Sequence, residues 1–402
     1  MANTFVTNKK TDLVALRAAE SAAYLTVGSK SYFGDQLEGK RNGQSYEFVI
    51  RDAGEYAEGM DMTGKVSNLV ERKVTKDIKL GNIVIDTNLV EKVTDVQWDK
   101  EIAYPNGKKL INGVVQSTLK DDIGLQNTAF VGKGWLPLSK ASRFLGSISS
   151  EKRFAFIDPM IDSIMAANGK SFDPVDAEPL YKTGMLGSFA GTEFREQQFL
   201  PSIEISKALA DELSSATVSG FVAGDAVSAT LRLSGVTETI PAGTPLFVEG
   251  IYATDTVGDK TSALKAFIAI EDATSGIVKV RPVDFTGVGT REACKADGSN
   301  VALADFGNAK LVNPLAEGTY FTGIFRLDGV MEFDTLGKLD WSNAEATSDS
   351  IEGIKVHEGR AVDVVAGSNK CRWAIASLAG IVDKRGAAYV CVKDSDVNLV
   401  TL

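Results

Sequence analysis

Apolar positions near the start of the chain recur at the spacing of a helix. Over residues 12–27 they form a single stripe, and Gly28 stands where the glycine after a helix belongs. The stripe is thin and rich in alanine, and its members are Val14, Ala18, Ala22 and Leu25. We therefore predict a helical arm that docks on a larger body.

Residues 45–80 show the alternation of apolar and polar positions that is typical of extended strands. In the first run, the apolar residues are Tyr46, Phe48 and Ile50. In the second run, 69–80, the apolar residues share one face, which Arg72 and Lys76 interrupt. Between the runs, 52–65 is rich in glycine and acidic residues and predicts a solvated turn. An isolated two-stranded hairpin is marginal in water, so this long hairpin should need a neighbour, in its own chain or in another subunit.

A long apolar stripe after Pro105 predicts a helix. Pro105, followed by Asn-Gly, should break the chain, and the helix should end before Gly124. Its apolar face consists of Leu110, Ile111, Val114, Val115, Thr118 and Leu119.

Two Asp-Pro steps predict further helix starts. Asp158 has the residue type of an N-cap, and Pro159 follows at the first helical position. An Asn-Gly pair at 168–169 should close that helix. A second Asp-Pro step at 173–174 predicts a short helix that ends near Gly184.

The chain changes character after Pro201, because 215–310 is rich in Thr, Val, Ala and Gly and has few helix signals. Several short alternating runs at this spacing predict a small β-barrel or sandwich. Mixed patterns return in the last ninety residues. The candidate strands lie at 227–233, 245–252, 264–270, 277–283, 318–333, 371–377 and 387–393.

Composition narrows the class of protein. The 402 residues are 44% hydrophobic and 24% charged, which is typical of a soluble globular chain of two or three folding units. With 43 basic and 53 acidic residues, the net charge is −10. A protein that wraps nucleic acid directly usually carries a basic excess, so direct DNA recognition is not expected.

The cysteines and apolar runs suggest a chain that is made and kept in a cytoplasm. Cys294, Cys371 and Cys391 are widely spaced and form no CxxC pair, so we expect buried, reduced thiols. The N-terminus lacks the apolar core of a signal peptide. The longest nearly apolar run, 374–382, is far shorter than a membrane span.

No set of side chains in the sequence converges on catalysis. The single histidine, His357, stands beside Glu358 in a polar stretch and is expected on the surface. Residues 59–65 have the spacing of a phosphate-binding loop, but Val66 replaces the Ser or Thr that would hold magnesium. The acidic residues from Asp394 onward lack the glycine and the length of a calcium loop. We therefore predict no enzyme activity, no cofactor, and no catalytic or metal-binding residues.

Several short stretches, taken in their order along the chain, carry a resemblance to a known family. They are 60–69 (MDMTGKVSNL), 156–159 (FIDP), 186–187 (LG), 190–191 (AG), 200–201 (LP), 371–374 (CRWA) and 387–392 (AAYVCV). With the order of the predicted elements, they resemble the major capsid (coat) protein of a tailed bacteriophage, which has the Hong Kong 97 fold. In more detail, they are similar to the coat protein of short-tailed Salmonella phages. Pro105 departs from this pattern, because it falls where the family's spine helix should run.

The resemblance implies an α+β, Hong Kong 97-like capsid fold with an inserted β-barrel-like domain. The insertion is matched by its position and β character alone. The implied parts are an N-terminal helical arm at 1–30, an extended loop with peripheral-domain strands at 31–82, a spine helix and axial domain at 83–202, the inserted β-rich domain at 203–312, and the C-terminal part of the axial and peripheral domains at 313–402.

The resemblance also implies a function in assembly. Copies would pack as hexamers and pentamers into an icosahedral shell around packaged double-stranded DNA, without sequence-specific contact. The implied partners are further copies of the chain, scaffolding and portal proteins, and no membrane. The protein would belong to the virion and be assembled in the cytoplasm of a host bacterium. An encapsulin-like shell subunit and a phage accessory or adhesion module remain the alternatives.

The charged side chains of the hairpin are the candidate residues for contacts between subunits. Within one subunit we expect them to be mostly exposed, where each contributes little to folding. Across a contact, the same charges would set register and partner choice. The candidates are Arg41, Glu47, Arg51, Glu55, Glu58, Asp61, Arg72 and Lys73.

Overall fold

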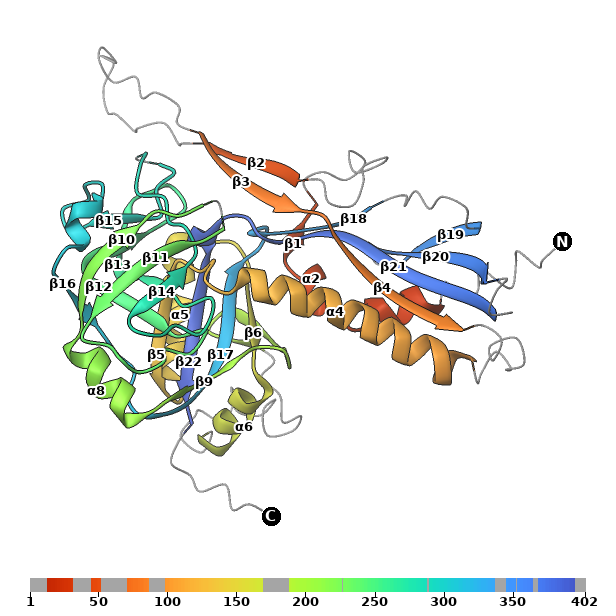
Figure 1. Ribbon diagram of the computed structural model, residues 1–402, viewed down its shortest axis with the longest axis horizontal. Coiled ribbons are helices and arrows are strands. Elements are labelled where there is room, and N and C mark those ends of the chain that lie inside the picture. The colour runs from red at the N-terminus through yellow and green to blue at the C-terminus, as the bar shows by residue number, and fades with distance from the viewer. Residues whose placement is uncertain are drawn as a thin grey trace, which may run out of the picture. The chain divides into compact units, whose positions relative to one another are not determined.

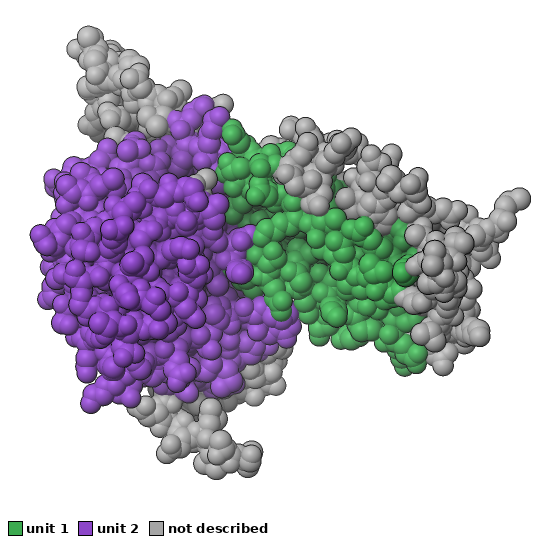
Figure 2. Space-filling view, viewed as in Figure 1, with its two compact units in different colours: residues 1–47, 75–119, 331–380 green, residues 48–74, 120–330, 381–402 purple. Residues whose placement is uncertain are grey.

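A computed structural model (Figure 1) describes most of the chain, which divides into two compact units (Figure 2). Unit 1 comprises Met1–Glu47, Thr75–Leu119 and Met331–Gly380, and unit 2 comprises Phe48–Val74, Lys120–Val330 and Ile381–Leu402. The described residues are 13–31, 45–51, 71–86, 98–168, 188–225, 227–287, 289–336, 345–351, 353–363 and 368–394. They form a mixed structure of many strands and few helices, in line with the predicted α+β class.

Unit 1 is built on a six-stranded sheet among the described residues, in the order β1-β18-β21-β20-β19, with β4 pairing β21. Strand β21 is antiparallel to β20 and β4, and β20 is antiparallel to β19, whereas β1 is parallel to β18. The strands are β1 (Ser29–Lys30), β4 (Lys79–Asp86), β18 (Met331–Thr335), β19 (Glu345–Ile351), β20 (Ile354–Asp363) and β21 (Ser368–Ile381).

Helices of unit 1 pack on this sheet and on each other. Residues 13–19 are helical and α2 spans Ala23–Thr26, and the predicted apolar stripe is fully buried. Gly28 follows α2 with φ of 67°, a left-handed conformation that favours glycine, as predicted. The long helix α4 (Tyr104–Asp122) has the predicted buried face. Its Val114 lies against β4, where a Cβ on Gly81 would be 3.2 Å from Val114 Cγ2.

The prediction that Pro105 breaks the chain is wrong. Pro105 lies in the first turn of α4, directly after the π-helical turn η3 (Asp99–Ala103). Proline lacks an N–H, so it removes one helical hydrogen bond. The wider π turn in front of it and the Asn106 side chain, whose Nδ2 donates to the Ile102 carbonyl at 2.7 Å, accommodate that loss.

The first sheet of unit 2 has seven described strands in the order β5-β22-β17-β6-β8-β7, with β9 pairing β17. β17 lies at its centre and is antiparallel to β22, β6 and β9, while β5 is parallel to β22 and β6 to β8. Helix α5 (Leu136–Ile148) packs against β5 and β22. The strands are β5 (Thr128–Lys133), β6 (Arg153–Ile157), β7 (Ser188–Phe189), β8 (Thr192–Glu196), β9 (Ser202–Ile205), β17 (Gly318–Leu327) and β22 (Ala387–Lys393).

The predicted step from strand to helix at Asp158 is confirmed. Strand β6 ends at Ile157 and helix α6 spans Pro159–Asn168. Asp158 Oδ1 accepts a hydrogen bond from the Met160 N–H at 2.8 Å, which satisfies one of the free donors of the first turn. The helix predicted after 173–174 lies outside the described residues.

The second sheet of unit 2 draws all its described strands from 217–312, in the order β13-β12-β16-β10-β11-β14, with β15 pairing β12. Helix α8 (Lys207–Ser215) precedes it and is capped by Ser206. Four aromatic rings pack in its core, with centroids 4.8 to 5.9 Å apart, namely Phe221, Phe267, Phe285 and Phe306. The strands are β10 (Thr217–Val222), β11 (Ala229–Ser234), β12 (Pro245–Thr254), β13 (Lys260–Ile268), β14 (Ile277–Val280), β15 (Ala293–Lys295) and β16 (Ala309–Val312).

The strands predicted in this segment are present, but they form an open sheet whose edge strands are β13 and β14. One backbone hydrogen bond, from Ile270 N to Lys279 O at 3.0 Å, links the two ends. A closed barrel is therefore not shown, and the independence of 203–312 as a domain stays a prediction.

The predicted hairpin is present as a two-stranded sheet of β2 (Ser45–Arg51) and β3 (Glu71–Asp77). The Ser45 hydroxyl donates to Asp77 Oδ1 at 2.6 Å, which ties the start of β2 to the end of β3. Along β3, Arg72, Val74 and Lys76 are buried or half-buried, whereas the alternating residues are exposed.

Candidate functional site: a buried charge cluster around Glu292

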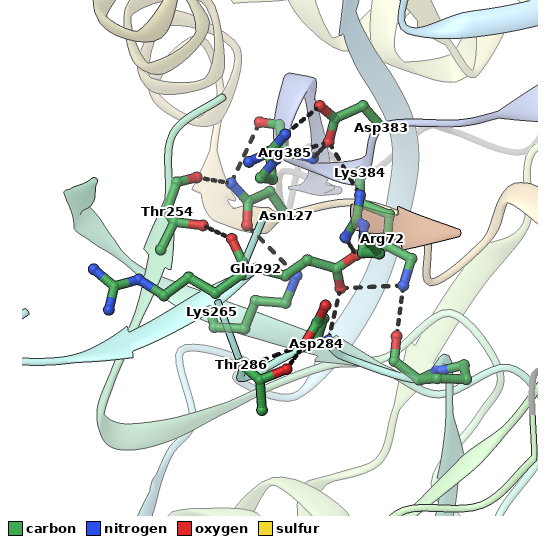
Figure 3. A network of polar contacts seen from close by, with 12 residues as sticks. Arg72, Asn127, Thr254, Lys265, Asp284, Thr286, Glu292, Asp383, Lys384 and Arg385 are labelled. Carbon is green, nitrogen blue, oxygen red and sulfur yellow. Dashed lines mark hydrogen bonds and ion pairs between the residues drawn. The ribbon is translucent and has the colours of Figure 1, made fainter. Parts of the chain in front are cut away.

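Six charged side chains meet in the interior of unit 2 (Figure 3). We call them the Glu292 cluster: Arg72, Lys265, Glu292, Asp383, Lys384 and Arg385. They come from distant parts of the sequence. Arg72 lies on β3, Lys265 on β13, and Glu292 directly before β15. The other three lie at the turn η6 (Lys384–Gly386), which joins β21 to β22.

Glu292 is the centre of the cluster, with its side chain only 2% exposed. Its Oε1 accepts from Arg72 Nη1, and its Oε2 accepts from Lys384 Nζ at 3.1 Å. Burial alone would raise the pKa of this carboxyl, but the positive charges of Lys384, Arg72 and Lys265 outweigh burial and lower the pKa to about 2. Glu292 is therefore ionised at neutral pH, as a buried carboxylate must be when cations surround it.

The turn η6 fastens the C-terminal part of the chain to the loop before β15. Arg385 binds Asp383 with two hydrogen bonds, Nε to Oδ1 at 3.0 Å and Nη2 to Oδ2 at 2.9 Å. Arg385 Nη1 also donates to the Gly289 carbonyl, and Lys384 Nζ to the Pro282 carbonyl. The turn thus contributes both a carboxylate and two cations to the cluster.

Lys265 is the unusual member, because its amine is almost fully buried and weakly bonded. Its side chain is 1% exposed, and its Nζ lies 3.5 Å from the Oδ1 of Asn127. The Asn127 Nδ2 donates to the carbonyls of Thr254 and Arg385, which turns Oδ1 toward the amine. Burial lowers the pKa of Lys265 to about 7, against the attraction of Glu292 and with further lowering by Lys384 and Arg72.

The arrangement holds charge and can exchange a proton near neutral pH. Four members can be cationic and two are carboxylates, so the cluster carries a formal charge of +2 with Lys265 protonated and +1 with Lys265 neutral. Its evident physical role is to fasten β3, the loop before β15 and η6 to one another.

The structure corrects the expected exposure of one candidate interface residue. Arg72 was expected on the surface, but its side chain is only 9% exposed and pairs with Glu292. It lies on the half-buried face of β3, where a charge needs a partner inside the chain. Lys73 and Glu47 are exposed, as predicted.

The structure does not describe the side chains of the remaining candidate interface residues. Arg51 ends β2, and Arg41, Glu55, Glu58 and Asp61 lie outside the described residues. The role of the whole set between subunits stays a prediction.

His357 was expected at the surface, and this prediction is wrong. Its ring is 4% exposed, and Nε2 lies 2.9 Å from the Leu336 carbonyl. Burial lowers the pKa of His357. The adjacent Glu358 is also buried and accepts a hydrogen bond from Trp373 Nε1 at 3.0 Å. By contrast, the three cysteines are buried and free, as predicted.

Sequence reasoning did not identify Lys265 or Glu292 as cluster members. Lys265 lies in the predicted strand 264–270, but both faces of β13 are buried near its end. A lysine inside the otherwise apolar run 263–270 was the available signal. No signal marked Glu292, because its partners come from other parts of the chain.

Two absences among the described residues also bear on the site. Within them, no three His, Cys, Asp or Glu side chains gather in the way that metal ligands do. No helix in the part of the chain that the structure describes is long and apolar enough to cross a membrane.

Comparison with known proteins gives structural neighbours alone, because no family model and no curated protein matches the chain. The chain is similar to the capsid of Ralstonia phage GP4, with 7% identity, a TM-score of 0.43, and coverage of 92% of this chain and 93% of that one. It is similar to the capsid of cyanophage Pam1, with 8% identity, a TM-score of 0.42, and coverage of 94% and 92%. It is also similar to a virus-like particle from Pyrococcus furiosus, with 9% identity, a TM-score of 0.39, and coverage of 95% and 98%. These identities and TM-scores are low, so no property of the neighbours is carried over to this chain.

Proposed function

We propose that the chain is the structural subunit of a tailed bacteriophage head. Copies would assemble as hexamers and pentamers into an icosahedral shell that encloses double-stranded DNA. The proposal starts from the order of short stretches that resemble phage coat proteins, those of short-tailed Salmonella phages in particular. Two of these stretches, at 371–374 and 387–392, lie in strands β21 and β22, and a third forms the step from β6 to α6.

The observation that carries the proposal is the hairpin β2–β3. Among the described residues it is a separate two-stranded sheet, and such a ribbon is marginal in water without a neighbour. One face of β3 is anchored inside the chain through Arg72. The opposite face presents Glu71, Lys73, Thr75 and Asp77, all exposed. A ribbon that is fastened at one face and charged at the other is suited to a contact with another copy.

Rings of five or six copies require one surface to complement a different surface of the next copy. Charges at such a contact select the partner and the register, and like charges placed opposite each other cost on the order of several kcal/mol. Scaffolding and portal proteins would be further partners of the shell. The net charge of −10 fits a shell wall that encloses DNA without reading its sequence.

The test exchanges two exposed charges of the hairpin. In the double variant Glu47→Lys, Lys73→Glu, the net charge and the charge balance within the hairpin are kept, but the signs presented to a neighbour are inverted. The matched control is Glu193→Lys, Arg195→Glu, which inverts an exposed ion pair on β8 whose side chains are 46% and 43% exposed. We expect both variants to fold, with assembly lost in the hairpin variant alone.

Sedimentation velocity and negative-stain electron microscopy measure the assembly, and circular dichroism measures the fold. The wild-type chain should form shells or rings, alone or when expressed together with a scaffolding protein. A wild-type chain that stays monomeric under both conditions contradicts the proposal. Normal shells from the hairpin variant remove the hairpin from the contact. Particles that contain a protein cargo in place of DNA would favour the encapsulin-like alternative.

A further inference from the structure

Glu292 has more cations around it than its two oxygens bind. Arg72 occupies Oε1 and Lys384 occupies Oε2. Lys265 also acts on Glu292 electrostatically, yet its hydrogen bond goes to Asn127 at 3.5 Å. Figure 3 shows the Lys265 amine pointing into the cluster, beside the Glu292 side chain. Lys265 is therefore positioned as a third cation for a carboxylate that already has two partners.

Arg72 is held less completely than its burial would suggest. A guanidinium has five donors, and Arg72 makes one hydrogen bond to Glu292 with a longer ion pair to Asp383, where Nη2 and Oδ1 are 3.6 Å apart. Its Nε is buried without a hydrogen-bond partner among the described residues. Buried donors are normally satisfied, so this contact is incomplete and can be exchanged for another.

We propose that Arg72 and the protonated amine of Lys265 are alternative partners for the Glu292 carboxylate, so that release of Arg72 with β3 is coupled to the uptake of one proton by Lys265. The proton comes from solvent and adds to the neutral amine of Lys265 to give an ammonium group. The exchange keeps the charge of the cluster at +1, because Lys265 becomes cationic as Arg72 leaves. This inference concerns the folded chain itself and does not depend on the proposed shell.

The surroundings of Lys265 fix the direction of this coupling. The charged groups that face the amine are Glu292 before β15, Lys384 and Asp383 at η6, and Arg72 on β3, while the side chain of Asn127 before β5 is neutral. With Arg72 in place, the pKa of Lys265 is about 7. Departure of Arg72 removes a cation that lowers this pKa and leaves the attraction of Glu292 unchanged. Lys265 then binds a proton at pH values above 7, so opening is favoured as the pH falls toward 7.

The experiment is hydrogen exchange of the β3 backbone amides in the full chain, measured by mass spectrometry and corrected for the pH dependence of intrinsic exchange. The opening equilibrium of the wild-type protein should rise by up to about tenfold for each pH unit between about pH 8.5 and pH 7, the slope for one coupled proton. Below about pH 7 it should level off. A wild-type opening equilibrium that does not change over this range overturns the proposal.

Two substitutions at Lys265 separate the proposed exchange from a general effect of pH. Lys265→Met has no titrating amine, so the slope should vanish. Lys265→Arg is a permanent cation, so β3 should open at about pH 8.5 as readily as the wild-type protein does at pH 7. The control is Lys260→Met, which removes another β13 lysine, one whose Nζ donates to the Ala296 carbonyl at 2.6 Å, and should keep the slope.

Either of two results contradicts the proposal. One is a slope that persists in Lys265→Met, since the proton would then be taken up elsewhere. The other is wild-type protection of β3 in Lys265→Arg at about pH 8.5. The Arg variant decides the question even if circular dichroism shows that the Met variant does not fold.

Discussion

Replacing Glu292 with Gln should destabilise the chain strongly at neutral pH. Gln keeps the size of the side chain and removes its charge, which leaves Arg72 and Lys384 buried beside a neutral amide. The pKa of Glu292 is lowered from 4.5 to about 2 in the folded chain. At about 1.4 kcal/mol per pKa unit, this corresponds to roughly 3 kcal/mol of stability. Breaking a buried ion pair by removing one partner typically costs about 3–5 kcal/mol, the same order.

The pH dependence of this effect has a defined sign. Because the folded-state pKa of Glu292 is below its ordinary value of 4.5, the unfolded chain binds more protons between about pH 4.5 and pH 2. The contribution of Glu292 is therefore fully present above pH 4.5 and is lost as the pH falls toward 2. The difference in unfolding free energy between wild type and Glu292→Gln should shrink over the same range.

Urea unfolding followed by circular dichroism measures this difference. The matched control is Glu193→Gln, because Glu193 also pairs with an arginine but is 46% exposed. An exposed pair contributes about 0–1 kcal/mol, so the control should stay close to wild type at every pH. A Glu292→Gln variant within about 1 kcal/mol of wild type at neutral pH, or one whose deficit persists unchanged near pH 2, would refute this reasoning.

Four further substitutions test the stability of the chain. Gly107→Ala should cost about 1–3 kcal/mol by thermal unfolding, because its Cβ would lie 2.7 Å from the Val14 carbonyl oxygen. In the same helix, a Cβ added at Gly113 would meet no atom within 4 Å. Gly113→Ala should therefore stabilise the chain by roughly 1 kcal/mol, because Ala favours the helix over Gly. Phe306→Ala, in the aromatic core, should cost about 3–5 kcal/mol in urea unfolding. Lys265→Met should abolish the rise in wild-type stability between about pH 7 and pH 10.5, since burial lowers the pKa of Lys265 from 10.5 to about 7.

Local elements could be predicted from the sequence where their signal is contained in a few residues. The hairpin strands, the capped helix after Asp158 and the strands within 217–312 all follow alternation, capping or turn residues. Helix α5 was missed although its buried positions, including Leu138, Ala141 and Leu145, have helical spacing. This spacing is a sufficient sequence signal for the helix.

Pairing between distant strands could not be predicted in the same way. Strand β22 is parallel to β5, and β17 lies between β22 and β6, so segments from 128 to 393 share one sheet. The apolar pattern of each strand indicates that the strand is buried. Many different neighbouring strands would fit the same pattern, so the pattern does not identify the pairing. The open ladder of the second sheet is a further case, because a predicted barrel and an open sheet use the same alternating strands.

The Glu292 cluster could not be predicted from the sequence for the same physical reason. Arg72 and Glu292 are separated by 220 positions, and Lys384 and Glu292 by 92. Arg72 stands on the face of β3 that the apolar pattern assigns to the interior, and a buried charge requires an opposite charge nearby. The sequence thus shows that Arg72 needs a partner but not which residue provides it. Reversing the charge at Arg72 would place like charges together at Glu292 and therefore tests folding. Only exposed hairpin positions such as Lys73 test assembly.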